Sequence, residues 1–119
     1  MRIATRLLPS ALVFPLLAAA ASAADIAKYR KIQLSDQFLA EGATFGDFNR
    51  DGVMDVVAGP YWYEGPDFVK RHEFYPAAPF DPLKYSDNFF AFAHDFNRDG
   101  WADILVLGFP GVDASWYEN

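Results

Sequence analysis

The chain has 119 residues, of which 52% are hydrophobic and 18% aromatic, and it contains no cysteine. Such a composition supports a packed core and excludes a disordered segment, while the absence of cysteine excludes a disulfide-stapled fold. The formal net charge of -6 at pH 7 makes binding to nucleic-acid phosphates or anionic lipids unfavourable.

The N-terminal segment has the three parts of a secretory signal peptide. Arg2 and Arg6 give a positive start, the apolar run LLPSALVFPLLAAAA follows, and ASA at positions 21–23 offers the small residues that signal peptidase accepts. The run is about 15 residues long and contains two prolines, whereas a membrane-spanning helix needs about 20 residues. We therefore predict a signal peptide at residues 1–23 and a secreted or periplasmic mature chain without a membrane span.

Segments rich in Val, Phe, Tyr, Trp and Ile follow, and these residues favour strands. In chain order the predicted strand segments are 42–48 (GATFGDF), 54–65 (MDVVAGPYWYEG), 89–96 (FFAFAHDF) and 101–109 (WADILVLGF). The segment 67–76 (DFVKRHEFYP) also alternates between polar and apolar residues and predicts a further strand. Residues 76–88, with three prolines, predict an irregular connection. The fold class expected is all-β.

An internal repeat organises the mature chain. DFNRDGVMD at 47–55 returns as DFNRDGWAD at 95–103, an offset of 48 residues. Upstream SDQF (35–38) is echoed by SDNF (86–89), and downstream WYEG (62–65) is echoed by WYEN (116–119). Repeats of this length are typical of solenoids and propellers. We predict one repeat region, residues 24–119, with two units at about 35–75 and 86–119.

The two acidic loops have the oxygen-rich spacing of a calcium site. Side chains at positions 1, 3, 5 and 9 offer carboxylate or amide oxygens, glycine at position 6 permits a sharp turn, and position 7 offers its backbone carbonyl. Loss of residues 1–23 removes two arginines and no acid, so the charge becomes -8, which favours a cation. The predicted metal ligands are Asp47, Asn49, Asp51, Val53 and Asp55 in the first loop, and Asp95, Asn97, Asp99, Trp101 and Asp103 in the second.

Two other interpretations compete with a calcium site in these loops. An EF-hand needs a bidentate glutamate at position 12 and flanking helices, but position 12 is Ala58 in one copy and Val106 in the other, both in strand-like runs. A metal-free Asn/Asp/Gly turn is the alternative, although carboxylates about 5 Å apart repel by about 3 kcal/mol per pair at an effective dielectric near 20. We expect Arg50 and Arg98, at position 4, to point outward into solvent.

The loops and their flanks resemble the FG-GAP or VCBS-like repeat of integrin-alpha-type β-propellers, over roughly residues 41–119. In the first unit Phe45-Gly46 precedes the loop and AGP (58–60) ends the strand, as in that family; the second unit has Ala93-His94 and LGFP instead. The resemblance implies propeller blades with Ca²⁺ in each loop, of the type found in bacterial exported proteins. Two blades make an incomplete propeller, so we predict a fragment or truncated product with open strand edges that promote self-association.

Few other residues indicate chemistry. The aromatic residues at 61–63 and 116–117 can form a sugar-stacking platform, but large rings at a repeat position are more typical of packing between blades. His72 and His94 lack a second histidine or a cysteine at zinc-ligand spacing. No serine of the mature chain lies in a G-x-S-x-G sequence. The sequence therefore predicts no catalytic residue.

Two functions follow from these features. The first is an exported calcium-binding propeller-repeat module that acts in binding or as a scaffold, with a protein or carbohydrate ligand and without enzymatic activity. The alternative is the N-terminal part of a larger carbohydrate-active propeller enzyme such as a polysaccharide lyase, because one fold can carry many functions.

Export gives the first testable prediction. When the chain is expressed with its leader in a Gram-negative host, mass spectrometry should find a mature N-terminus near Ala24 or Asp25, because the ASA site precedes these residues. Recovery of protein that retains Met1 in the cytoplasm would contradict the predicted signal peptide.

Overall fold

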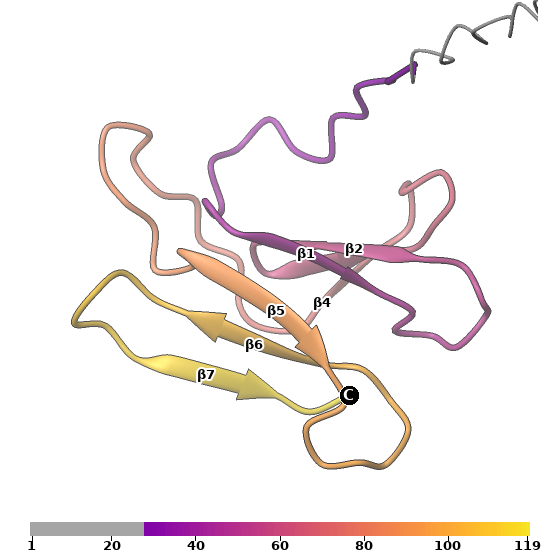
Figure 1. Cartoon of the computed structure of the whole chain (residues 1–119). Helices are drawn as coiled ribbons and strands as arrows, with labels where there is room; N and C mark the ends of the chain where they lie inside the picture. Colours follow the sequence, from indigo (N-terminus) through magenta and orange to yellow (C-terminus); the bar gives the residue numbers. More distant parts are fainter. Residues whose placement is uncertain (1–27) are drawn as a thin grey trace, which may run out of the picture. The chain divides into compact units, whose positions relative to one another are not determined.

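The computed structural model describes residues 28–119, of which Lys31–Asn119 form one compact unit. The predicted signal peptide lies outside the described residues. Within residues 28–119 there is no helix, and every regular element is a β-strand (Figure 1). The predicted all-β class is thus confirmed. None of the described residues belongs to a helix that is long and apolar enough to cross a membrane.

The first sheet is an antiparallel meander of four strands. They are β1 (Ala43–Gly46), β2 (Asp55–Ala58), β3 (Tyr61–Tyr63) and β4 (Arg71–Glu73), and their order in the sheet is the order in the chain. Gly59 lies in the tight turn between β2 and β3 with a φ of 63°, and a Cβ atom there would lie 2.7 Å from Leu39 Cβ. Only glycine suits both the positive φ and this close approach.

The second sheet repeats the first three strands. It contains β5 (Phe90–His94), β6 (Asp103–Leu107) and β7 (Ala114–Tyr117), again antiparallel and in chain order. The two loops predicted to bind calcium connect β1 to β2 and β5 to β6 (Figure 1). The prediction that strands rather than helices flank both loops is confirmed. Residues 76–88 form no strand, as expected from their prolines.

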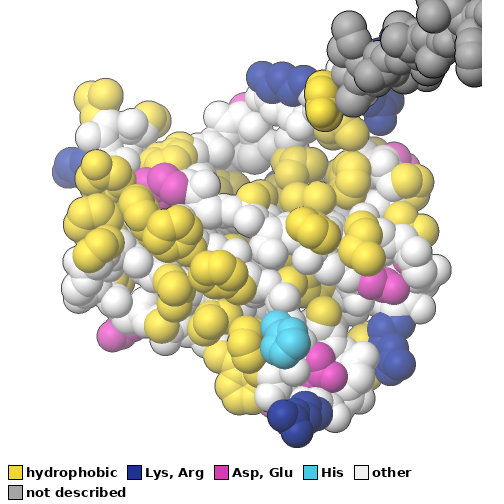
Figure 2. Space-filling model, viewed as in Figure 1, with side chains coloured by type: hydrophobic (Ala, Val, Ile, Leu, Met, Phe, Trp, Pro, Cys, Tyr) yellow, Lys and Arg dark blue, Asp and Glu magenta, His cyan; other side chains and the backbone are white. Residues whose placement is uncertain are grey.

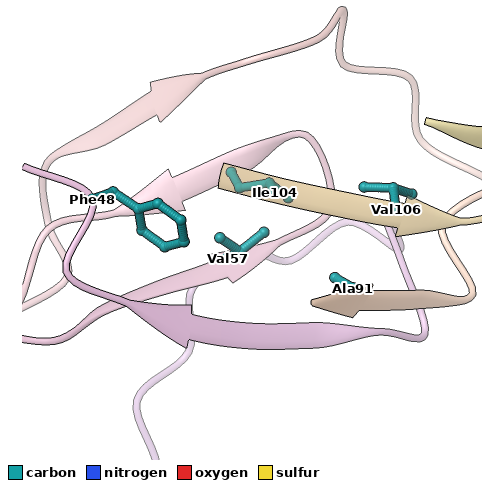
Figure 3. Packing of buried hydrophobic residues seen from close by; sticks show 5 residues of the cluster. All are labelled: Phe48, Val57, Ala91, Ile104 and Val106. Atoms are coloured by element: carbon teal, nitrogen blue, oxygen red, sulfur yellow. The ribbon is translucent and has the colours of Figure 1, made fainter. Parts of the chain in front are cut away.

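One face of each sheet is buried against the other sheet. Cross-strand partners share a face of a sheet, so Thr44, Val57 and Trp62 lie together on the first sheet. They face the second sheet, where Ala93, Ile104 and Tyr117 form one row and Ala91, Val106 and Ser115 the next. Figure 3 shows the resulting core, to which Phe48, Val57, Ala91, Ile104 and Val106 contribute.

Polar contacts also join the two halves of the unit. The Glu41 carboxylate accepts hydrogen bonds from the backbone N–H and the hydroxyl of Ser86. At the other end, the Asn119 side chain donates to the backbone carbonyl of Phe48 at 2.8 Å. Buried polar groups cost free energy unless they are paired. A shift of one sheet relative to the other would break these hydrogen bonds, so they help to fix the alignment of the sheets.

The predicted aromatic packing between the units is found for Trp62 and Tyr117, which pack against the core cluster between the sheets. Tyr63 is buried on the opposite face of the first sheet, beside the segment around Leu39. Trp116 differs, because it lies on the opposite face of the second sheet and is 50% exposed.

Truncation of the central valine tests the packing. We expect Val57→Ala to lower the free energy of unfolding by about 2–3 kcal/mol, because it removes two buried methyl groups and leaves a cavity between the sheets. Val57 is 0% exposed, whereas Val69 is 80% exposed, so Val69→Ala should change stability by less than about 0.5 kcal/mol. Urea unfolding followed by tryptophan fluorescence measures both, and equal effects would contradict the core described here.

Candidate functional site

The two acidic loops have the same internal hydrogen bonds. In the first loop the Asp47 carboxylate accepts from the backbone N–H groups of Asp51 at 3.0 Å and Gly52 at 2.9 Å. In the second loop the Asp95 carboxylate accepts from Asp99 at 3.1 Å and Gly100 at 2.9 Å. Position 1 thus holds the backbone of positions 5 and 6 in both copies.

Positions 3 and 5 continue this pattern. Asn49 Oδ1 accepts from the backbone N–H of Asp51, and the Asn49 amide donates to Asp51 Oδ2. Asp51 Oδ1 in turn accepts from the backbone N–H of Val53 at 2.8 Å. Asn97, Asp99 and Trp101 make the same three bonds in the second loop. The side chains at positions 1, 3 and 5 are therefore brought together by the turn itself.

The backbone at positions 4 and 6 adopts a left-handed conformation. Gly52 and Gly100 have φ values of 85° and 92°, which the predicted sharp turn at position 6 requires. Arg50 and Arg98 also have positive φ values, 59° and 65°, although this conformation is uncommon for a residue with a long side chain. The Asx-type hydrogen bonds on either side compensate for that cost. Nothing in the arginine side chain itself predicts this conformation.

Position 9 has a role that the sequence pattern does not reveal. Asp55 and Asp103 are both 0% exposed. Asp55 Oδ2 accepts from the backbone N–H of Phe48 at 2.9 Å, and its Oδ1 accepts from Gly65 at 2.9 Å. Asp103 makes the corresponding bonds to Phe96 and Asn119, both at 3.0 Å. Each carboxylate joins the start of its loop to the residue that lies three places after the repeated tryptophan.

Burial and hydrogen bonding act in opposite directions on Asp103. Burial raises its pKa, but the backbone N–H groups of Asn119 and Phe96 donate to the carboxylate and outweigh burial. The pKa of Asp103 is therefore lowered from its usual value, and the buried group is held as a carboxylate at neutral pH.

The two loops also contact each other. The Arg50 guanidinium lies over the Trp101 ring, with Cζ 4.9 Å from the ring centroid. Arg50 is exposed, as expected for position 4, but it is not merely solvated, since a cation over an indole face is attracted by the ring quadrupole. This contact pairs position 4 of one loop with position 7 of the next. Arg98 is exposed as well.

A second polar cluster lies beside the first hairpin. Glu64 Oε1 lies 2.6 Å from Lys70 Nζ and 2.7 Å from His72 Nε2. The hydrogen bonds from Lys70 and His72 lower the pKa of Glu64. His72 stacks on the Trp62 ring with a centroid distance of 4.0 Å. His72 thus has packing and hydrogen-bond partners that account for its position.

The acidic side chains are turned toward the loop backbone. Within residues 28–119, no group of three or more His, Cys, Asp or Glu side chains is arranged to hold a metal ion. In both loops, backbone N–H groups of positions 5, 6 and 7 donate to the carboxylates of positions 1 and 5. These hydrogen bonds offset part of the repulsion among the carboxylates.

Comparison with protein-family models, with curated proteins and with solved structures finds no match for this chain. A function is therefore inferred from the geometry of the two loops and of the sheets that carry them.

The lowered pKa of Asp103 gives a prediction with a defined pH dependence. A carboxyl whose pKa is lower in the folded state stabilises the fold above its unfolded pKa, and this stabilisation is lost as the pH falls through the folded pKa. At pH 7, Asp103→Asn should lower the free energy of unfolding by about 1–3 kcal/mol, because the single amide oxygen cannot accept from both N–H groups with the strength of a carboxylate. The difference in the free energy of unfolding between wild type and variant should become smaller as the pH falls below the usual aspartate range.

Urea unfolding between pH 7 and pH 3 measures this difference. Asp113→Asn is the control, since Asp113 is an exposed residue outside the loops. If the difference in the free energy of unfolding between wild type and Asp103→Asn stays constant with pH, the carboxylate charge is not what stabilises the hairpin.

Proposed function

We propose that this chain is an exported calcium-binding repeat module of the FG-GAP or VCBS-like propeller type, which acts in binding or as a scaffold. The observation that carries the proposal is the recurrence of one loop geometry. Both loops place side-chain oxygen atoms of positions 1, 3 and 5 on the turn, and they do so with the same set of hydrogen bonds. A turn that served only to reverse the chain would not need the same acids at the same positions twice.

The donor set suits a hard cation. A carboxylate oxygen has two lone pairs, so an oxygen that accepts one N–H bond can still bind a metal. Calcium takes about six to eight oxygen ligands and accepts carboxylate, amide, carbonyl and water oxygens. The residues that would hold it are Asp47, Asn49, Asp51, Asp55 and the carbonyl of Val53 in one loop, and Asp95, Asn97, Asp99, Asp103 and the carbonyl of Trp101 in the other.

The ion would supply charge compensation and cross-linking to a loop that is already folded. The hydrogen bonds of positions 1, 3 and 5 close the turn without metal, so calcium would stabilise it rather than create it. Extracellular calcium modules bind with dissociation constants of about 10⁻⁴–10⁻³ M. At about 0.1 mM affinity and about 1 mM calcium, each site would add roughly 1.4 kcal/mol to the free energy of unfolding. In a chain without disulfides this is a substantial share of the total.

The arrangement of the sheets supports the propeller part of the proposal. Two antiparallel meanders pack face to face, and β1 of the first lies against β5 of the second (Figure 1). A blade of this kind cannot bury both faces alone, so it needs neighbours. A rigid stack of blades presents its loops at fixed positions, which suits a scaffold for a protein or carbohydrate ligand.

Calcium titration tests the loops directly. Isothermal titration of chelator-treated protein should give two equivalents. One equivalent of calcium should be lost in the double variant Asp47→Ala, Asp51→Ala. The other equivalent should be lost in the double variant Asp95→Ala, Asp99→Ala, because each double variant removes ligands from one loop. Arg50→Ala and Arg98→Ala should leave the stoichiometry unchanged, since position 4 offers no oxygen ligand from its side chain.

Alanine at these positions also removes hydrogen bonds that close the turn, so a second double variant is needed that keeps part of this hydrogen bonding. Asp47→Asn with Asp51→Asn keeps an Oδ1 acceptor at each position and removes two negative charges. We expect it to keep the fold, as judged by circular dichroism, and still to lose one equivalent of calcium. If folded wild-type protein takes up no calcium at millimolar concentration, the loops are metal-free turns.

A further inference from the structure

The exposed face of the second sheet repeats the buried face of the first. With the 48-residue offset, Thr44 on β1 corresponds to Phe92 on β5, and Val57 on β2 corresponds to Leu105 on β6. The repeated WYE sequence makes Trp62 on β3 correspond to Trp116 on β7. In both sheets these three positions are cross-strand partners and so form one row on one face.

The two rows differ in what covers them. Val57 is 0% exposed because the second sheet packs on it, and Trp62 packs against the same cluster. The corresponding Phe92 and Trp116 are 47% and 50% exposed, and neighbouring Phe90 is 52% exposed. Figure 2 shows hydrophobic side chains gathered over this sheet. Apolar residues gathered in this way on a sheet face mark an interaction surface.

The first sheet carries the complementary face. The face of the second sheet that packs against the first contains Ala91, Ala93 and Ile104. With the 48-residue offset, the corresponding residues of the first sheet are Ala43, Phe45 and Val56. These three residues lie on the face of the first sheet that points away from the second. The segment around Leu39 lies against the Ala58 and Tyr63 part of this face. Phe45 remains 69% exposed.

We propose that a second copy of this chain covers these surfaces head to tail, with the Phe92 face of one copy on the Phe45 face of the next. A second copy is the partner that fits because each uncovered face corresponds, by the repeat, to a face that is covered in the interface between the two sheets of one chain. The contact between copies would therefore repeat the contact within the chain. A different partner would have to reproduce a surface that the chain itself carries. Because the two faces differ, the contact is heterologous and forms either a closed ring or an open chain.

The internal interface also predicts which residues meet between copies. A Cβ atom on Gly46 would lie 3.4 Å from Ala93 Cβ. The repeat equivalents of Gly46 and Ala93 are His94 and Phe45, and both are exposed. His94 of one copy should therefore lie beside Phe45 of the next.

Cysteine trapping tests this register, since the chain has no cysteine of its own. Under mild oxidation, a mixture of His94→Cys and Phe45→Cys chains should give a disulfide-linked dimer that contains one of each. Neither variant alone should give this dimer, because a heterologous contact does not bring two copies of one position together. Leu83→Cys mixed with His94→Cys is the matched control, since Leu83 is 93% exposed but lies on neither face.

A second measurement uses size in solution and does not depend on disulfide geometry. In analytical ultracentrifugation, Phe92→Asp and Phe45→Asp should each lose the self-association of wild type, because each has one damaged face. Their equimolar mixture should recover a dimer and nothing larger, through the two intact faces. Leu83→Asp should associate as wild type does, and circular dichroism should show that all variants are folded.

Three outcomes would overturn the proposal. Wild type that stays monomeric at roughly tens of micromolar, where an interface of standard size would associate, would show that no copy covers these faces. If Phe92→Asp abolishes association but Phe45→Asp does not, the contact is symmetric and joins the second sheet of one copy to the second sheet of another. Equal trapping with Leu83→Cys would indicate nonspecific collision.

Discussion

A buried carboxylate at the ninth position of each loop holds its hairpin together. Asp55 and Asp103 accept two backbone N–H bonds each, one from the loop and one from the end of the third strand. Without this acceptor, the loop amide and the amide after the strand would lose their partners at buried or part-buried positions, which is costly. The bond therefore fixes where the loop begins and where the third strand ends. The polar side chains at positions 1, 3 and 5 can lie in register only because this anchor sets the ends of their loop.

This anchor explains why the sequence repeat extends beyond the acidic loop. The WYEG and WYEN sequences place Gly65 and Asn119 at equal distances after their tryptophans, and both donate their backbone N–H to position 9. The two intervals between loop and tryptophan differ by six residues, yet the bond is kept. Two of the extra residues form an additional cross-strand pair, Leu107 with Ala114, and the other four lengthen the connection from β6 to β7. The register of the strands at the tryptophan is unchanged.

Much of the fold could be predicted from local patterns. Runs of β-branched and aromatic residues predicted the strands on both sides of each loop, and the Asn, Asp and Gly spacing predicted the turns, because these properties depend on near neighbours in the chain. The predicted segment 54–65 is divided at Gly59 into β2 and β3, and β7 lies outside the predicted strand segments. The stacking of one sheet on the other depends on residues about 50 places apart and could not be read from periodicity. The contact of Arg50 with Trp101 and the outward position of Trp116 arise from that stacking. For the same reason, pattern alone assigned Asp55 and Asp103 to the metal and did not anticipate their backbone partners.

The separation between local pairing and distant stacking has a consequence for how the chain folds. Every strand pairs with its neighbour in sequence, so loop closure within each sheet costs little entropy. The core and the bond from Asn119 to Phe48, by contrast, join residues from opposite ends of the unit. Docking of the two meanders closes the longest loops and so carries the larger entropic cost, and residues 76–88 are the tether whose length sets the effective concentration of one sheet for the other.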